Sequence, residues 1–236
     1  MKPAPSSFEE IIRQVAIFRQ AGSQDISAIA HLAGTVQVDE EGFFFHQGDP
    51  ARRLFIMVEG RAKICKISPD GQQINLRTIS PNQLFGAIGS VEPEGNYPAS
   101  AQALENCSAL VIESQEFARL LKDRPQLSFG LMQLMTGYIQ EMQERYHELA
   151  TQKVHQRIAR VLLRLAAQSG QKMGSGILID LPFSRQDLAE MAGTTLFTVS
   201  RVLTGFEKQG LISTGRERVT IIRPHELVRL AEDLDS

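Results

Sequence analysis

The hydrophobic and polar positions of the chain follow three successive patterns. Residues 8–33 carry apolar side chains at helical spacing, interrupted near Gly22, which predicts two short helices. Residues 35–112 consist of short β-type runs separated by glycine-containing turns, and regularly spaced strands of this kind predict a sandwich or a β-roll. After Glu116 the helical spacing returns and dominates the rest of the chain, so the whole pattern predicts an α+β fold.

A long helix is predicted from Pro125 to about Thr151, because proline suits a first helical position and only Gly137 interrupts the run. One apolar stripe can cover the β-domain and consists of Leu127, Leu131, Leu134 and Tyr138. A second stripe has the 4-3-4-3 spacing of a coiled coil and consists of Met135, Ile139, Met142, Tyr146 and Leu149. Two stripes on one helix favour a dimer seam against a second copy of the chain. A single buried helix without a dimer is the alternative.

Residues 183–212 have the pattern of two helices joined by a short turn. Ser184 and Asp187 resemble a capping box for the first helix, and Gly193 supplies the turn. Thr195 is the expected N-cap of the second helix, and Gly210 lies where that helix should end. An ordinary helical hairpin in the core of an enzyme has the same form and is the competing interpretation.

The segment that follows the second helix favours DNA binding over a core hairpin. Residues 212–222 predict two short strands around a turn at Gly215, and the turn displays Arg216 and Arg218. A hairpin with arginines at its tip, directly after a recognition helix, is a wing suited to contact phosphates. A winged helix-turn-helix is therefore expected at the C-terminal end, with its second helix in the major groove of DNA.

The composition adds few constraints. The 236 residues, 42% of them hydrophobic and 22% charged, are a normal mixture for one or two globular domains. No apolar run approaches the roughly 18 residues of a membrane span, and the first residues lack the parts of a signal peptide. A cytoplasmic protein with no membrane partner is therefore expected. Cys65 and Cys107 are the only cysteines and lie far apart, which indicates neither a disulfide framework nor a cysteine-based metal site.

The formal net charge of -2 hides an asymmetry between the two parts of the chain. Residues 1–150 hold 13 Lys and Arg against 18 Asp and Glu, whereas residues 151–236 hold 12 against 9. Because phosphate neutralisation by Lys and Arg supplies most non-specific affinity for nucleic acid, only the C-terminal part is expected to meet DNA.

The order of these parts resembles the Crp/Fnr family of bacterial transcription regulators. Its marks here are Gly48-Asp49, Glu59-Gly60, Pro69-Asp70-Gly71, Leu84-Phe85-Gly86, Ala99-Ser100-Ala101-Gln102-Ala103 and Thr198-Val199-Ser200-Arg201. The resemblance implies a β-roll sensor (a double-stranded β-helix, or jelly roll) over residues 1–124, a dimerisation helix over 125–151 and a winged helix-turn-helix over 152–236. It also implies a homodimer on a near-palindromic site in double-stranded DNA, with RNA polymerase as a protein partner.

The recognition residues divide by role within this resemblance. Arg201 suits a guanine, because its guanidinium matches the O6 and N7 acceptors of that base. The family commonly has a glutamate where this chain has Phe197, and a phenylalanine meets a thymine methyl but cannot accept from a cytosine amino group. Arg201 is therefore expected to keep the family's guanine, while the step at Phe197 becomes thymine-preferring or relaxed. Base or groove contacts are expected from Phe197, Thr198, Ser200 and Arg201, and phosphate contacts from Thr194, Thr195, Arg216 and Arg218.

The resemblance also gives expectations for the effector. Cyclic-nucleotide members of the family have a glutamate where this chain has Ala87, and an arginine where it has Pro98-Ala99. Burying a phosphate without its cation is costly, so cyclic AMP is not expected. A less charged ligand is expected in an effector pocket formed by Gly86, Ala87, Ile88, Tyr97, Ala99 and Ser100.

The runs 85–89 and 99–105 are closer to the oxygen- and nitrogen-oxide-responsive, Fnr-like branch of the family. The iron-sulfur members of that branch need four cysteines, three of them before the roll, and none precedes Cys65. An iron-sulfur cluster is therefore not expected, and a haem is left open as a cofactor. Its candidate axial ligands are His31, His46, His147 and His155.

The chain is thus expected to be a sequence-specific DNA-binding transcription regulator, not an enzyme, controlled by an effector or a redox or gas signal at the β-roll. A haem-based gas sensor and a cyclic-nucleotide-type effector-binding module are the alternatives. A small β-barrel metalloenzyme is disfavoured, because no strand offers the paired histidines that such a metal site needs.

Overall fold

The computed structural model describes residues 5–67, 73–87, 91–92, 94–174, 176–179, 183–215 and 218–232. The chain forms two compact units, residues 1–141 and 142–236, which divide inside one long helix, α5 (Pro125–Thr151). The three-part division expected from the sequence, with boundaries at both ends of that helix, stays a prediction. Among the described residues, no helix is long and apolar enough to cross a membrane.

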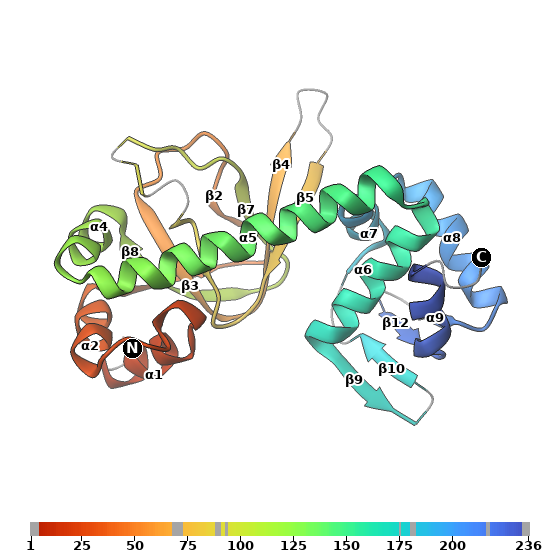
Figure 1. Ribbon diagram of the computed structural model, residues 1–236, viewed down its shortest axis with the longest axis horizontal. Helices are drawn as coiled ribbons and strands as arrows, with labels where there is room; N and C mark the ends of the chain where they lie inside the picture. The colour runs from red at the N-terminus through yellow and green to blue at the C-terminus, as the bar shows by residue number, and fades with distance from the viewer. Residues whose placement is uncertain are drawn as a thin grey trace. The chain divides into compact units, whose positions relative to one another are not determined.

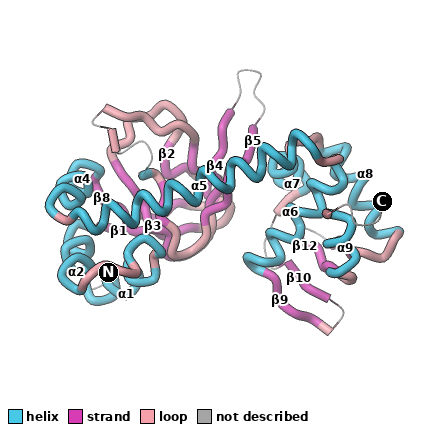
Figure 2. The backbone as a smooth tube through the Cα atoms, in the orientation of Figure 1, coloured by secondary structure: helices cyan, strands magenta, loops and turns pink. Residues whose placement is uncertain are grey.

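The N-terminal unit is a β-roll with short helices at one end (Figures 1 and 2). Its helices before α5 are α1 (Pro5–Gln14), the 3-10 helix η1 (Ala16–Phe18), α2 (Ser23–Leu32) and α4 (Ser114–Asp123). Its strands are β1 (Gly34–Val38), β2 (Phe43–Phe45), β3 (Arg53–Glu59), β4 (Ala62–Ile67), β5 (Gln73–Ile79), β6 (Leu84–Phe85), β7 (Ser100–Ala103) and β8 (Cys107–Glu113). They form two antiparallel sheets, with strand orders β1-β8-β3-β6 and β2-β7-β4-β5. The α+β class and the roll predicted from the sequence are confirmed.

Aromatic rings fill the interior of the roll. Phe45 stacks on Tyr97 with ring centroids 3.8 Å apart, and Phe55 stacks on Phe85 at 5.2 Å. Phe44 meets both Phe55 and Phe85 edge-on. Each such ring removes about 150–250 Å² from water when buried, so these five rings form a large part of the core.

The first half of α5 packs against the core of the N-terminal unit, as the first apolar stripe predicts. Leu127 and Leu131 are buried in a cluster with residues of α1, α2 and β3. Gly130 allows this close approach, because a methyl group at that position would lie 2.3 Å from the carbonyl oxygen of Ile17. The helix is therefore held on the unit by complementary shape as well as by apolar burial.

A buried carboxylate joins the N-terminal helices to the start of α5. Asp25 in α2 accepts hydrogen bonds from the Gln126 side-chain amide at 3.0 Å and from the Arg124 guanidinium. It also accepts one from the backbone amide of Gly22, the N-cap of α2. Its side chain is 7% exposed. The bond from Gln126, supported by Arg124, holds the pKa of Asp25 below its ordinary value although burial acts to raise it.

The C-terminal unit contains the end of α5 and a helical domain with a small sheet. The elements after α5 are α6 (Val154–Ser169), β9 (Gly170–Met173), β10 (Gly176–Ile179), α7 (Arg185–Ala192), α8 (Leu196–Lys208), β11 (Ile212–Gly215), β12 (Arg218–Ile221) and α9 (Pro224–Ala231). The strands form one antiparallel sheet in the order β11-β12-β10-β9. Ile158 and Leu162 of α6 are fully buried and hold α7, α8 and the sheet in one core. This core fixes the paired helices α7 and α8.

Candidate nucleic-acid interface and effector region

The turn between α7 and α8 is built by the local signals read from the sequence. The backbone amide of Ser184 donates to Asp187 at 2.8 Å, and the Ser184 hydroxyl accepts from the Asp187 amide at 3.1 Å. Gly193 ends α7 in the left-handed conformation, with φ of 60°, which a side chain would disfavour. The amide of Thr194 then donates to Ala189 at 2.9 Å. The capping box and the glycine turn are confirmed.

The second helix, α8, begins at the predicted cap. The Thr195 hydroxyl accepts a hydrogen bond from the Thr198 amide at 3.3 Å, which caps the helix. Val199, Leu203 and Phe206 are buried and hold one face of α8 against the core. The opposite face is therefore left for a partner outside the unit.

The side chains expected to read DNA lie on that free face. Phe197 is 76% exposed, which is unusual for a large apolar ring and indicates a role outside the core. Arg201 is exposed one helical turn further on, whereas Ser200 is half-buried. Thr194 is also half-buried, directly before the cap.

Arg185 belongs to the same face and was missed from the sequence. It is the first residue of α7, and its Nη1 donates to the hydroxyl of Ser200 on α8 at 3.3 Å. The Arg185 side chain is exposed, so a cation stands beside the recognition helix. A basic residue directly after the cap Ser184 was the available signal, because the N-terminus of a first helix faces the DNA backbone in this motif.

A second arginine, Arg157, fixes the turn between α7 and α8. Arg157 of α6 donates to Ala192 at 3.0 Å, to Gly193 at 3.3 Å and to Gln152 at 2.9 Å, in each case to the carbonyl oxygen. Two of these acceptors end α7, where the carbonyls lack partners within the helix and a cation is favourable. Arg157 thus ties the turn of the motif to the residues that follow α5.

The end of α5 also touches this turn. A methyl group at Gly193 would lie 2.8 Å from Cδ2 of Leu149, so the glycine leaves room for that leucine. Glu148, one residue earlier, accepts two hydrogen bonds from Arg164 of α6, at 2.7 and 3.0 Å. The last turn of α5 therefore packs on the turn of the helix-turn-helix and is attached to α6 by an ion pair.

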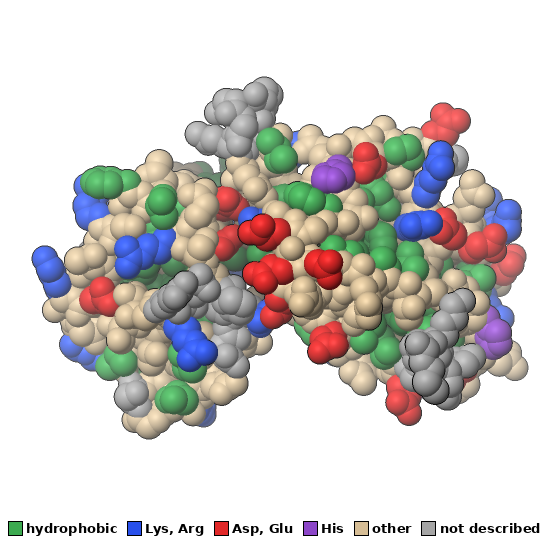
Figure 3. Space-filling view, turned by 180° about the vertical axis from the view of Figure 1, so that it is seen from behind, with side chains coloured by type: hydrophobic (Ala, Val, Ile, Leu, Met, Phe, Trp, Pro, Cys, Tyr) green, Lys and Arg blue, Asp and Glu red, His purple; other side chains and the backbone are tan. Residues whose placement is uncertain are grey.

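The predicted wing is the hairpin of β11 and β12. Glu207 near the end of α8 accepts from the Thr214 amide at 2.9 Å and from its hydroxyl at 2.6 Å. The hydroxyl bond lowers the pKa of Glu207, so the tether is ionised at neutral pH. Arg218 is exposed at the start of β12, and Arg216 lies outside the described residues. On the face drawn in Figure 3, Lys and Arg side chains are spread over the C-terminal unit, and Asp and Glu side chains gather on the N-terminal one.

The second apolar stripe of α5 is exposed over most of its length. The exposed fractions lie between 53% and 75% for Ile139, Met142, Tyr146 and Leu149. Met135 differs, because it is half-buried against the core of the N-terminal unit. Met132, three residues earlier in the same spacing, is 59% exposed and extends the stripe toward the start of the helix. An isolated helix with such a stripe would leave a large apolar surface in water.

Four of the six residues expected to line an effector pocket are buried in the N-terminal unit. Tyr97, Ala99 and Ser100 are at most 5% exposed, and Ala87 is 3% exposed within the N-terminal core. Gly86 has φ of 78° in a tight turn, and Ile88 lies outside the described residues. The Ser100 hydroxyl accepts from the Gln47 amide at 2.8 Å. These buried side chains make core contacts of their own, and their role in an effector pocket stays a prediction.

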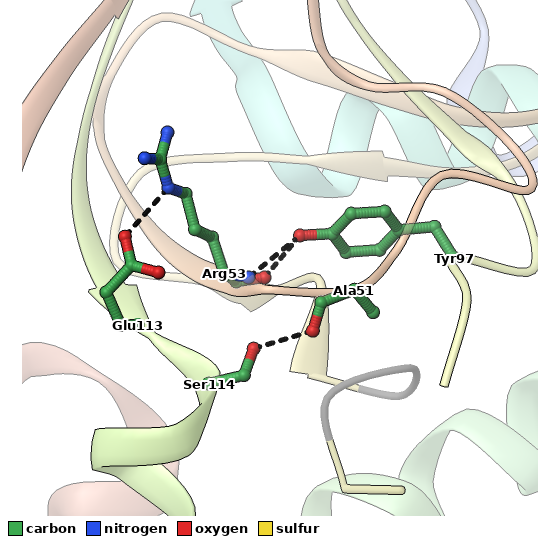
Figure 4. A network of polar contacts seen from close by, with 5 residues as sticks. All are labelled: Ala51, Arg53, Tyr97, Glu113 and Ser114. Carbon is green, nitrogen blue, oxygen red and sulfur yellow. Dashed lines mark hydrogen bonds and ion pairs between the residues drawn. The ribbon is translucent and has the colours of Figure 1, made fainter. Parts of the chain in front are cut away.

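Tyr97 is held by a polar network at the edge of the roll (Figure 4). Its hydroxyl donates to the carbonyl oxygen of Arg53 at 2.5 Å and accepts from the Arg53 amide at 3.2 Å. The Arg53 side chain pairs with Glu113 at 2.8 Å, and the Ser114 hydroxyl donates to Ala51 at 2.8 Å. Burial raises the pKa of Tyr97, so its hydroxyl stays protonated and the ring is fixed in place.

Two of the four candidate haem ligands, His31 and His46, make ordinary structural contacts. Nδ1 of His31 lies 2.7 Å from the carbonyl oxygen of Ser27, and the ring of His46 lies 4.3 Å from that of Phe43. Within the described residues, no three His, Cys, Asp or Glu side chains gather in a group that could hold a metal ion. Both cysteines are buried as free thiols. A haem is therefore left open, as it was from the sequence.

Two family models match separate parts of the chain. Residues 35–124 match the cyclic nucleotide-binding domain, and residues 156–230 match the Crp-like helix-turn-helix domain. The two matches correspond to the β-roll and to the domain that contains α7, α8 and the wing.

Several relatives match the chain over most of its length. The transcriptional activator protein anr of Pseudomonas aeruginosa is 34% identical over 80% of this chain and 77% of that protein. The CRP-like cAMP-activated global transcriptional regulator of Mycobacterium tuberculosis is 25% identical over 94% of this chain and 99% of that protein. Among solved structures, FixK2 of Bradyrhizobium japonicum is 21% identical, with a TM-score of 0.74 over 84% of this chain and 96% of that one. The last similarity concerns the fold alone.

Proposed function

The chain belongs to the Crp/Fnr family of DNA-binding transcription regulators, and on that premise we propose that it acts as an effector-controlled homodimer on a near-palindromic site. The observation that carries the proposal is the free face of α8, where Phe197 and Arg201 are exposed beside a buried opposite face. Relatives of both the CRP-like and the Anr type match the chain, and the higher identity to Anr favours the Fnr-like branch. RNA polymerase is the proposed protein partner.

Base readout is assigned to two residues. Arg201 makes a bidentate contact with guanine, worth about 1–3 kcal/mol of discrimination against another base. Phe197 covers the 5-methyl group of a thymine, because an exposed phenyl ring gains contact with a methyl but offers no hydrogen bond. Burying one methyl contributes roughly 0.8 kcal/mol, which corresponds to about a fourfold change in affinity.

Phosphate contacts are assigned to the polar side chains around the two readers. They comprise Thr194, Thr195, Arg216 and Arg218, together with Arg185, which stands beside Ser200. Thr198 and Ser200 keep the base or groove contacts expected from the sequence. The phosphate contacts position the helix on the duplex and do not specify sequence. Their loss should weaken binding to all sequences alike and reduce its dependence on salt.

Dimerisation is assigned to the exposed stripe of α5. Its a and d positions, running from Met132 to Leu149, would be covered by the same positions of a second copy. Because Leu149 also packs next to Gly193, a change in helix pairing reaches the turn of the DNA-binding motif through one side chain. The effector region of the roll biases this pairing, which is the proposed route of control.

A base-substitution experiment tests the readout directly. Fluorescence anisotropy of the full chain would be measured on duplexes with two half-sites one helical turn apart, replacing each thymine in turn by uracil. One thymine per half-site should show about a fourfold loss, because uracil lacks only the methyl group. The loss should disappear in Phe197→Glu, and substitution outside the half-sites is the control. If no thymine position responds, Phe197 does not read a methyl group.

The guanine contact is tested on the same duplexes with Arg201→Ala. Both subunits of the homodimer lose the contact, about 2–6 kcal/mol in total, so affinity should fall by roughly 30-fold or more and the preference for guanine at one step of each half-site should relax. Binding of DNA that is unaffected by this substitution would contradict the DNA-reading role of α8.

A further inference from the structure

Arg77 lies on the inward face of β5, where its neighbours contribute to the core. It is directly opposite Ile64 on β4, which in turn is opposite Ala101 on β7. Ala101 is fully buried, Ile64 packs against the same cluster, and Ile79, two residues along β5, is 1% exposed. Since alternate residues of a strand share a face, the guanidinium stands at the end of an apolar row.

The contacts of Arg77 leave part of its hydrogen-bonding capacity unused. The centre of the guanidinium lies 4.0 Å from the ring centroid of Tyr138 on α5. Its Nε is 4.0 Å from a carboxylate oxygen of Glu141, which is an ion pair but too long for a hydrogen bond. Nη1 is buried and finds no hydrogen-bond acceptor among the described residues. A guanidinium carries five N–H donors, so this group has room for an acceptor from outside.

The surroundings hold Arg77 and Tyr138 in place. The Tyr138 hydroxyl donates to the carbonyl oxygen of Leu84 at 3.1 Å, which fixes the ring as a flat wall against the guanidinium. The Arg77 side chain is 23% exposed, compared with 41% for Glu141. A buried donor without a partner is expensive, and such groups in native proteins call for a ligand or another acceptor.

We propose that Arg77 anchors a site for a small singly charged oxyanion between the inward face of β5 and Tyr138 of α5. The anion is a carboxylate or a phosphodiester, because the planar fork of arginine matches two oxygens of either group. Glu141 limits the charge, since a second negative charge on the ligand would meet its carboxylate. This chain lacks the arginine that cyclic-nucleotide members of the family have at Pro98-Ala99. Arg77 therefore supplies the roll with a different inward-facing cation.

The site at Arg77 would serve the proposed effector control. Anion binding at Arg77 does not depend on the proposed function, and only its regulatory consequence rests on it. A ligand on Arg77 competes with Glu141 for the guanidinium and changes the contact between β5 and α5. Because α5 also carries the proposed dimer seam, a ligand bound at this site would act on the helix that forms the dimer interface, with no other helix or strand between them.

Isothermal titration calorimetry of the full chain tests the site with three probes. Benzoate supplies a carboxylate, cyclic AMP supplies a phosphodiester, and benzamide is the neutral counterpart of benzoate. One of the two anions should bind saturably, benzamide should not, and the anion that binds identifies the source of the charge. Arg77→Gln should weaken binding by about tenfold or more, because hydrogen bonds to a charged group are worth about 1.5–3 kcal/mol.

Two further variants make the result specific. Arg119→Gln removes an exposed arginine of the same unit, paired with Glu116, and should leave anion binding unchanged. Glu141→Gln should strengthen binding severalfold, a gain that a folding defect cannot produce. Failure of both anions to bind, or equal weakening by the two arginine variants, would overturn the inference.

The DNA assay separates this inference from the proposed function. If the chain binds its operator but neither anion, only the site at Arg77 is wrong. If an anion binds through Arg77 but no DNA is bound, the site stands and the proposed function falls.

Discussion

Replacing Arg157 by Met should destabilise the C-terminal unit. The substitution keeps most of the side-chain volume but removes three hydrogen bonds, to the carbonyl oxygens of Gln152, Ala192 and Gly193. At about 1 kcal/mol for each bond, the free energy of unfolding should fall by roughly 3 kcal/mol. For a unit of this size, about 4–8 °C is lost per kcal/mol, which predicts a drop in Tm of more than about 10 °C.

Arg160→Met is the matched control on the same helix. Arg160 donates one hydrogen bond, to the carbonyl oxygen of Ala231 at 3.3 Å. The same change of charge and shape should therefore lower the free energy of unfolding by about one third as much. Differential scanning calorimetry of the full chain follows the transition of each unit. Equal drops for the two variants would refute the claim that Arg157 holds the turn through its three acceptors. Below its Tm, Arg157→Met should also bind DNA more weakly, because the α7–α8 turn is less fixed.

Three other changes have defined outcomes. The lowered pKa of Asp25 contributes stability that is complete above about pH 4 and is lost as the pH falls through the folded-state pKa, so urea unfolding of Asp25→Asn should show a smaller acid dependence than the parent. Tyr97→Phe removes both bonds to the Arg53 backbone and should lower the free energy of unfolding by about 1–3 kcal/mol, measured by chemical denaturation; no change would mean that the network of Figure 4 is dispensable. Gly193→Ala places a methyl group 2.8 Å from Leu149 Cδ2 in a left-handed backbone, and a thermal melt should show a loss of at least about 1–2 kcal/mol, whereas equal stability would contradict the tight fit.

The parts of the interface that depend on neighbouring residues could be predicted from the sequence. The bond pair of Ser184 and Asp187, the left-handed Gly193 and the cap at Thr195 each need only three or four residues to form. The buried face of α8 likewise follows from helical spacing, because the period alone decides that Val199, Leu203 and Phe206 line up. Phe197 was left exposed by the same rule.

The parts that depend on distant residues could not be predicted. Asp25 meets its partners 99 and 101 residues further along the chain, and no local pattern announces such a contact. Arg77 was missed because an irregularity in pairing between Ile64 and Cys65 hides which face of β5 looks inward. Met135 fits the coiled-coil spacing, yet packing on the N-terminal core half-buries it, since spacing does not say which of two surfaces a residue covers.

The bond from Glu207 to Thr214 has a consequence for the energetics of DNA binding. A loose hairpin would lose conformational freedom on meeting the duplex, about 1–2 kcal/mol for each residue fixed. The carboxylate already holds the start of the wing to the end of α8, so that freedom is given up during folding and not at the groove. The recognition helix and the wing strand are therefore held in a fixed arrangement before DNA binds. A duplex whose shape fits only one of them cannot contact both and should bind weakly.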